Sequence, residues 1–119
     1  MKRCHRMKRS SDFARLRREG QSRAGRFLVV SHMHDPSITK ESPFLIGIIT
    51  SRKVGMAVVR NRARRRIRAL ANDMAAQIAP GSMLVVIARY TISKADYGEL
   101  RHDWNRLGSK MGIFTSLSA

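Results

Sequence analysis

The sequence predicts an α+β domain, with helices packed on a central sheet as in an α/β sandwich. Three segments carry apolar residues at helical spacing, and three others are apolar runs of strand length. Their order along the chain is helix, strands, helix, strand and helix, which is typical of helices layered on one sheet. A chain of 119 residues suits one core. We therefore expect one domain over residues 1–119, with a loose basic N-terminus over residues 1–6 and a short loose C-terminus over residues 113–119.

The first predicted helix covers about residues 12–19. A serine directly before it can act as the N-cap, and Gly20 directly after it can end it. Phe13 and Leu16 lie three residues apart and are expected on its buried side. Residues 21–25 then form a linker or a short, irregular edge strand.

Two predicted strands follow. Residues 26–33 alternate between the two faces of a strand. One face carries Phe27, Val29 and Ser31, and the other carries Leu28, Val30 and His32. Turn-forming residues fill positions 34–43. Residues 44–51 are almost all apolar, which predicts a strand that is central or buried on both faces.

The longest predicted helix runs from about residue 56 to residue 78 and ends before a Pro-Gly pair. Its apolar residues recur at steps of three and four and so form one stripe. The stripe consists of Val59, Ala63, Ile67, Leu70, Met74 and Ile78. At about 100° per residue, Asn61, Arg65 and Arg68 lie opposite this stripe.

Residues 83–89 predict a third strand, and a last helix follows it. Ser93 can cap this helix, with Asp96 as its capping-box partner. The apolar stripe of the helix consists of Tyr97, Leu100, Trp104, Leu107 and Met111.

The composition points to a polyanionic partner. Lys and Arg number 24 against 8 Asp and Glu, which gives a net charge of +16 and favours nucleic acid or anionic lipid. No apolar run approaches the roughly 20 residues of a membrane span, and no secretory signal is present. Cys4 stands alone, which excludes an intramolecular disulfide and a thiolate metal cluster. We expect a cytoplasmic protein without a membrane partner.

The arginines of the 56–78 helix repel one another, because five of them form i,i+4 pairs. Each such pair costs about 0.2–0.5 kcal/mol in an isolated helix. No carboxylate lies between Glu41 and Asp73 to relieve them. A merely solvated face usually mixes both signs of charge, whereas guanidinium groups match phosphate oxygens. The helix therefore predicts a nucleic-acid surface.

This helix and the turn before it also carry an ordered set of motifs. They run Ser51-Arg52-Lys53-Val54-Gly55, then Ala57-Val58-Val59, then Arg60-Asn61-Arg62, with Arg65 and Arg68 further along. In this order and spacing, the motifs closely resemble the signature of the bacterial ribonuclease P protein subunit. The resemblance extends from about Met7 to Gly112 in motif order and element lengths.

The resemblance implies a left-handed crossover around the basic helix, although such connections are generally right-handed. It implies that a partner RNA subunit carries the catalytic centre. The protein would assist Mg²⁺-dependent removal of the 5′ leader from precursor tRNA, with the ions held by RNA, and we expect one protein per RNA subunit. It assigns RNA-subunit binding to Arg60, Asn61, Arg62, Arg64, Arg65 and Arg68. It assigns the leader cleft to Phe13, Phe27, Ser51 and Lys53.

The cleft residues have alternative interpretations. Phe13 and Phe27 can stack RNA bases, at about 1–3 kcal/mol per base, or can be ordinary core aromatics. Ser51 and Lys53 precede the basic helix, whose free N–H groups favour anions. Many family members carry aromatic residues where this chain has Arg17 and Val30. The leader contact is therefore expected to depend more on charge and less on stacking.

The sequence suggests no catalytic side chains of its own. The acidic residues are scattered, and none lies in the basic signature. His32 and His34 could share one strand face, but without a third ligand they are expected to face solvent. The alternative function is a structural ribosomal-type or general RNA-binding or chaperone protein with no role in cleavage. Composition fits both functions, and the full signature favours ribonuclease P.

Overall fold

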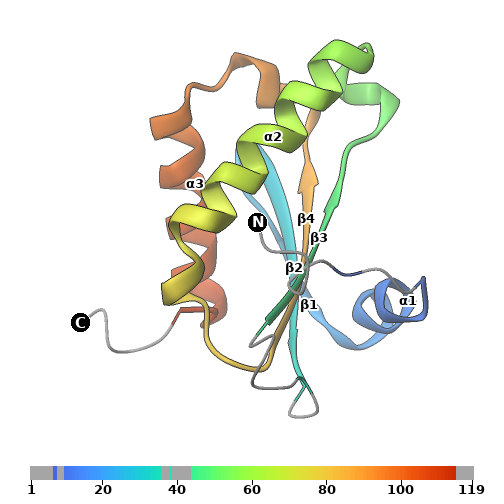
Figure 1. The fold of residues 1–119 in the computed structure, drawn as a ribbon, viewed down its shortest axis with the longest axis vertical. Coiled ribbons are helices and arrows are strands. Elements are labelled where there is room, and N and C mark those ends of the chain that lie inside the picture. Colours follow the sequence, from blue (N-terminus) through green and yellow to red (C-terminus); the bar gives the residue numbers. More distant parts are fainter. Residues whose placement is uncertain (1–6, 8–9, 36–37, 39–43, 115–119) are drawn as a thin grey trace.

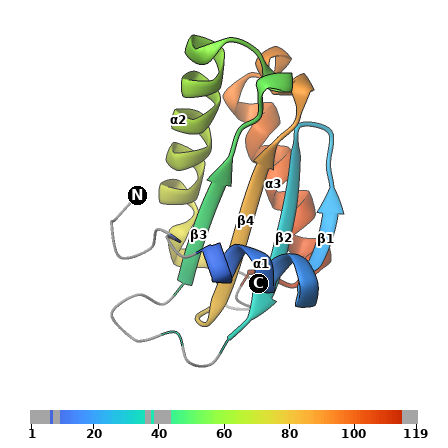
Figure 2. The ribbon, with the colours of Figure 1, turned by 90° about the vertical axis from the view of Figure 1, so that its right-hand side faces the viewer.

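Figures 1 and 2 show a computed structural model of the chain, in which helices cover both faces of one sheet. The structure describes residues 7, 10–35, 38 and 44–114. The helices are α1 (Ser10–Glu19), α2 (Ala57–Asp73) and α3 (Tyr97–Met111), and the 3-10 helices are η2 (Arg52–Val54), η3 (Ala75–Gln77) and η4 (Tyr90–Lys94). The strands are β1 (Gln21–Ala24), β2 (Leu28–His34), β3 (Phe44–Ile49) and β4 (Ser82–Ala88). The predicted class and element order are confirmed.

The strands lie in the order β1-β2-β4-β3. β2 is antiparallel to both β1 and β4, whereas β3 is parallel to β4. α2 connects the two parallel strands. In Figure 2, α2 lies behind the sheet. β3 and β4 both point upward, and β4 lies to the right of β3. This path is a left-handed crossover, as the resemblance implied and contrary to the general preference.

Both faces of the sheet are buried because side chains alternate along the strands. On β4, Leu84 and Val86 belong to the larger core, whereas Met83 and Val85 belong to the smaller one. The larger core lies between the sheet and the helices α2 and α3. It includes most of both predicted helical stripes: Ala63, Ile67, Leu70, Met74, Ile78, Leu100, Trp104 and Leu107. The smaller core lies on the opposite face of the sheet, which is the face that α1 covers in Figures 1 and 2.

β3 lies at the edge of the sheet, so of the two predicted alternatives, central or buried on both faces, the second is the one observed. Its residues are apolar because both faces are covered: Phe44 and Ile46 pack in the larger core, while Leu45 and Ile49 pack against the smaller one. The outer edge of β3 is also contacted, since the backbone N–H of Met7 donates to Ile46 O at 2.9 Å. A covered edge strand thus has the same apolar sequence as a central one.

Several element ends differ from prediction. α1 begins at Ser10, and α2 ends at Asp73, where η3 continues the chain. α3 is capped by Asp96 rather than Ser93, which lies inside η4. Asp96 Oδ1 accepts the N–H of Glu99 at 2.8 Å, and the Glu99 side chain accepts the N–H of Asp96 at 3.1 Å. The capping box is therefore formed by Asp96 and Glu99, three residues further along the chain than the predicted pair of Ser93 and Asp96.

The start of the predicted loose C-terminus is packed instead. Gly112 ends α3 in a left-handed conformation with φ of 70°. This turn buries Ile113, which is 1% exposed, and lets Phe114 form a bridge with Ile78. The remainder of the predicted loose ends, residues 1–6 and 115–119, lies outside the described residues.

We expect the stability of the fold to depend on pH through His32. Its Nε2 lies 3.1 Å from Ser82 Oγ, and burial, aided by His34, lowers the pKa of its imidazole below the usual 6.5. The unfolded state therefore binds this proton first, and stability should fall as the pH drops below about 6.5. Urea unfolding at about pH 7 and about pH 5 should show a smaller loss for His32→Gln than for wild type. Equal losses would contradict this role.

Candidate nucleic-acid interface

The apolar stripe of α2 fixes which of its arginines reach solvent. Ala63, Ile67 and Leu70 are buried against the sheet. Asn61, Arg62 and Arg65 are exposed, whereas Arg60, Arg64 and Arg68 are half-buried. The helix therefore presents two different basic surfaces. We call Asn61, Arg62 and Arg65 the outer face, and Arg60, Arg64 and Arg68 the flank.

Arg68 was predicted opposite the stripe and lies on the flank instead. Long helical side chains lean back toward the helix N-terminus and can follow a neighbouring element. Arg68, with Arg64, lines a hollow beside Ile46 and Ile48 of β3. The position of the Arg68 side chain depends on β3, which packs beside α2. The periodicity of α2 alone cannot predict which element packs there.

The arginines of both surfaces lack carboxylate partners within the described part of the chain. The ion pairs found there involve Arg15, Arg18 and Arg106. Arg64 donates to Thr50 Oγ1 at 2.8 Å, while Nε of Arg60 and of Arg68 is buried without a hydrogen-bond partner. The strong charge of α2 is therefore not neutralised internally and favours an anionic ligand.

Arg66 differs from the other arginines of α2. It donates to the backbone carbonyls of Ile92 and Ala95 at the end of η4. The Ile92 carbonyl also accepts the N–H of Ala95, so Arg66 adds a second donor there and supplies a side-chain donor to Ala95. Arg66 therefore stabilises the connection between β4 and α3 and is not counted in the interface.

Two hollows share Phe13: one lies at the edge strand β3, between α1 and the flank of α2, and the other lies under α1. The hollow beside the flank has a volume of about 150 Å³ and the one under α1 about 210 Å³. The first is lined by Met7, Phe13, Ile46, Gly47, Ile48, Arg64 and Arg68. The second is lined by Phe13, Leu16, Arg17, Ser22, Val29, Ser31, Ile49, Val85 and Ile87. We call the two together the Phe13 groove.

Gly47 allows Phe13 to lie against the sheet. A Cβ atom on Gly47 would be 2.7 Å from Cε1 and Cζ of the Phe13 ring, which is too close. A glycine inside a strand often marks such a close approach. Gly47, a glycine inside an apolar strand, is thus the sequence signal that could have placed Phe13 over β3.

Phe27 does not line this groove, so the predicted pairing of Phe13 and Phe27 is wrong. Phe27 is 5% exposed and packs in the larger core, on the α3 side of the sheet. It precedes β2 in a turn, so the strand alternation assumed for residues 26–33 does not include it. Val30 also faces the larger core, and the groove is lined by Val29 and Ser31 instead. The departure at Val30 therefore does not affect the groove, whereas Arg17 does line it.

Ser51 and Lys53 are exposed in the turn before α2. η2 occupies residues 52–54, and Gly55 and Met56 separate it from the first turn of α2. No side chain caps α2, and its first turn contains no acidic residue. The two residues thus lie near a helix N-terminus but do not line the Phe13 groove.

The described residues include no group of three His, Cys, Asp or Glu side chains that could hold a metal ion. None of the described helices is both long and apolar enough to cross a membrane.

Comparison with known proteins gives the family. Residues 1–112 match the family model of ribonuclease P. The chain belongs to the family of ribonuclease P protein components. Membership connects it with tRNA processing by ribonuclease P and with an RNA partner in a ribonucleoprotein.

Relatives and solved structures agree with this membership. The ribonuclease P protein component of Streptomyces griseus is 42% identical over 83% of this chain and 85% of its own length. That of Bacillus cereus is 36% identical over 92% of this chain and 96% of its own. The fold is similar to the Staphylococcus aureus RNase P protein, with a TM-score of 0.79 and 28% identity over 93% of this chain and 98% of that one. The Thermotoga maritima protein gives a TM-score of 0.73 and 26% identity over 86% and 93%.

Proposed function

We propose that this protein binds the catalytic RNA subunit of ribonuclease P and the 5′ leader of precursor tRNA, and so assists removal of the leader. The observation that carries the proposal is the Phe13 groove, an apolar floor bordered by arginines without carboxylate partners. Single-stranded RNA binds to such a combination of stacking surface and positive charge.

The groove suits a leader strand for three reasons. Phe13 stands where its two hollows meet and offers a ring for one base. Arg64 and Arg68 border one hollow and Arg17 the other, so phosphates can be neutralised on both sides of that ring. One aromatic residue beside three arginines makes the contact depend more on charge than on stacking. This agrees with the expectation drawn from Arg17, which stands where many family members carry an aromatic residue.

The outer face of α2 suits the RNA subunit. Asn61, Arg62 and Arg65 point away from the core and are free to contact phosphates without unfolding the helix. Arg64 and Arg68 of the flank, by contrast, border the groove. We therefore divide the predicted RNA-subunit site between two RNAs: the outer face contacts the RNA subunit, and Arg64 and Arg68 contact the leader. Arg60 lines neither hollow and stays assigned to the RNA subunit.

The chemistry is assigned to the RNA subunit, with Mg²⁺ held by RNA phosphates and one protein per RNA subunit. The chain's own residues bind and orient the substrate strand, which raises the fraction of precursor bound in a reactive geometry. This division of labour accords with the scattered carboxylates of the sequence.

Reconstitution tests the proposal against a purely structural RNA-binding role. The purified protein with its RNA subunit should cleave precursor tRNA at the mature 5′ end faster than the RNA subunit alone. The protein alone should not cleave. Cleavage by nuclease-free protein without RNA would contradict RNA-borne catalysis, and an unchanged RNA-subunit rate would favour the structural role.

Binding to the RNA subunit should weaken steeply with salt. Each neutralised phosphate contributes a slope of about −0.9 in log K against log salt. Arg62→Gln should therefore reduce the slope by about one unit. Arg23→Gln is the matched control, because Arg23 is exposed on β1, away from α2. Equal changes of slope for both variants would show that only total charge matters.

A further inference from the structure

A second cavity lies on the face of the sheet opposite the Phe13 groove, between the N-terminal half of α3 and the turn before β2. Its volume is about 490 Å³. It is lined by Arg26, Phe27, Asp96, Gly98, Glu99, His102, Asp103 and Arg106. Nothing in the proposed leader or RNA-subunit contacts uses it.

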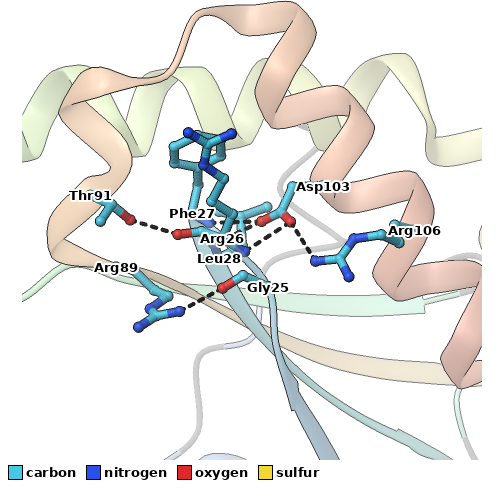
Figure 3. A network of polar contacts seen from close by, with 8 residues as sticks. All are labelled: Gly25, Arg26, Phe27, Leu28, Arg89, Thr91, Asp103 and Arg106. Atoms are coloured by element: carbon cyan, nitrogen blue, oxygen red, sulfur yellow. Dashed lines mark hydrogen bonds and ion pairs between the residues drawn. The ribbon is translucent and has the colours of Figure 1, made fainter.

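The turn that carries Arg26 and Phe27 is unusually well fixed, as Figure 3 shows. Asp103 accepts the backbone N–H groups of Arg26, Phe27 and Leu28 at 3.0, 2.9 and 3.1 Å. The carbonyls of Gly25 and Arg26 accept from Arg89 Nη1 and Thr91 Oγ1 at 2.6 and 2.7 Å. Gly25 N–H donates to Leu28 O, and Arg89 N–H donates to Phe27 O. Every N–H and C=O of residues 25–28 is thus bonded, which presents the two side chains in one geometry.

Those two side chains form a stacking surface. The Arg26 guanidinium lies over the Phe27 ring, 5.1 Å from its centroid, while Arg26 itself is exposed. A guanidinium plane supported in this way can stack a nucleobase on its outer side.

Some charged side chains of the cavity are already hydrogen-bonded within the protein, and others form no ion pair there. Asp103 is bonded to three N–H groups and to Arg106, and Asp96 and Glu99 form the capping box of α3. Arg26 and His102 are exposed and form no ion pair within the described residues. The carboxylates would repel a bare phosphate, yet they can accept hydrogen bonds from the N–H groups of a base.

We propose that this cavity binds one nucleotide of a single-stranded RNA, its base stacked on Arg26 and its phosphate beside His102 and Arg106. The site is separate from the Phe13 groove, because α3 and α1 lie on opposite faces of the sheet. A cavity of this volume is within the range that holds a small ligand, about 300–1,000 Å³.

The test is an amide NMR titration of the full chain with ribonucleoside 5′-monophosphates. Saturable shifts are expected at Gly25–Leu28 and in the first two turns of α3. Gly98→Leu should abolish them without changing charge: a Cβ there meets only Asp96 Oδ1 at 3.4 Å, so the larger side chain can enter the cavity. Leu is also a better helix former than Gly, so the fold should be kept.

Charge and site are separated by two matched variants. Arg26→Ala should weaken nucleotide binding at least about fivefold, the lower limit for one stacked base. Arg101→Ala removes the same charge from an exposed position outside the cavity and should have little effect. Equal weakening by both would overturn the proposal, as would inorganic phosphate that gives the same shifts at the same concentration. Phe13→Ala should leave the shifts intact, and their loss in that variant would place the binding in the groove and overturn the second site.

Discussion

Asp103→Ala should lower the free energy of unfolding by about 3–5 kcal/mol, a large share of the roughly 5–15 kcal/mol typical of a domain. Asp103 is 3% exposed and accepts three backbone N–H groups from a turn 75–77 residues away in sequence. Without its carboxylate, these donors lose their partners, and those of Phe27 and Leu28 are buried. Urea unfolding monitored by circular dichroism measures the loss.

Asp96→Ala is the matched control, because it makes the same substitution on the same helix. Asp96 is an exposed N-cap, whose removal typically costs about 1 kcal/mol. If Asp103→Ala lost no more stability than Asp96→Ala, water would be replacing the carboxylate and the turn would not depend on it. Asp103→Asn should lose only part of this stability, because the amide oxygen can still accept a hydrogen bond. The amide NH₂ group, however, would face backbone N–H groups, which are also donors.

Phe13→Ala in the holoenzyme should weaken the binding of precursor tRNA by about 1–3 kcal/mol, or about 5- to 150-fold, if one leader base stacks on the ring. Mature tRNA should bind as it does to wild type, because it has no leader to enter the groove. Assembly with the RNA subunit should be nearly unchanged, since the outer face of α2 is intact. The stability loss should be below the roughly 3–5 kcal/mol of a fully buried Phe→Ala, because Phe13 is half-buried.

Gly47→Ala tests the same groove without removing the ring. The added methyl group would be 2.7 Å from the Phe13 ring and should displace it from the groove floor. Precursor affinity should fall while mature tRNA is again unaffected. If both variants weakened precursor and mature tRNA equally, or only lowered stability, Phe13 would be an ordinary core residue and the leader contact would rest on the arginines.

Much of the fold follows from local pattern. The stripes of α2 and α3 are recognisable because burial on one side imposes a 3.6-residue period, and most of their predicted members are buried. The terminal turns are harder, because Asp96 and Ser93 are both acceptable caps and only the path of η4 selects between them. β3 illustrates the same limit, since an apolar run reports burial and not position in the sheet.

The sequence by itself determined the family, through a signature of fixed order and spacing, and it placed Asn61 and Arg65 on the exposed side of α2, through helical phase. Only the tertiary structure decided that Arg64 and Arg68 border the groove with Phe13, and that Phe27 faces α3 instead. The reason is that these placements depend on partners far away in the chain. Phe27 lies in a turn fixed by Asp103, before the regular alternation of β2 begins. The residue at which regular strand pairing begins determines the face of the sheet to which each side chain points.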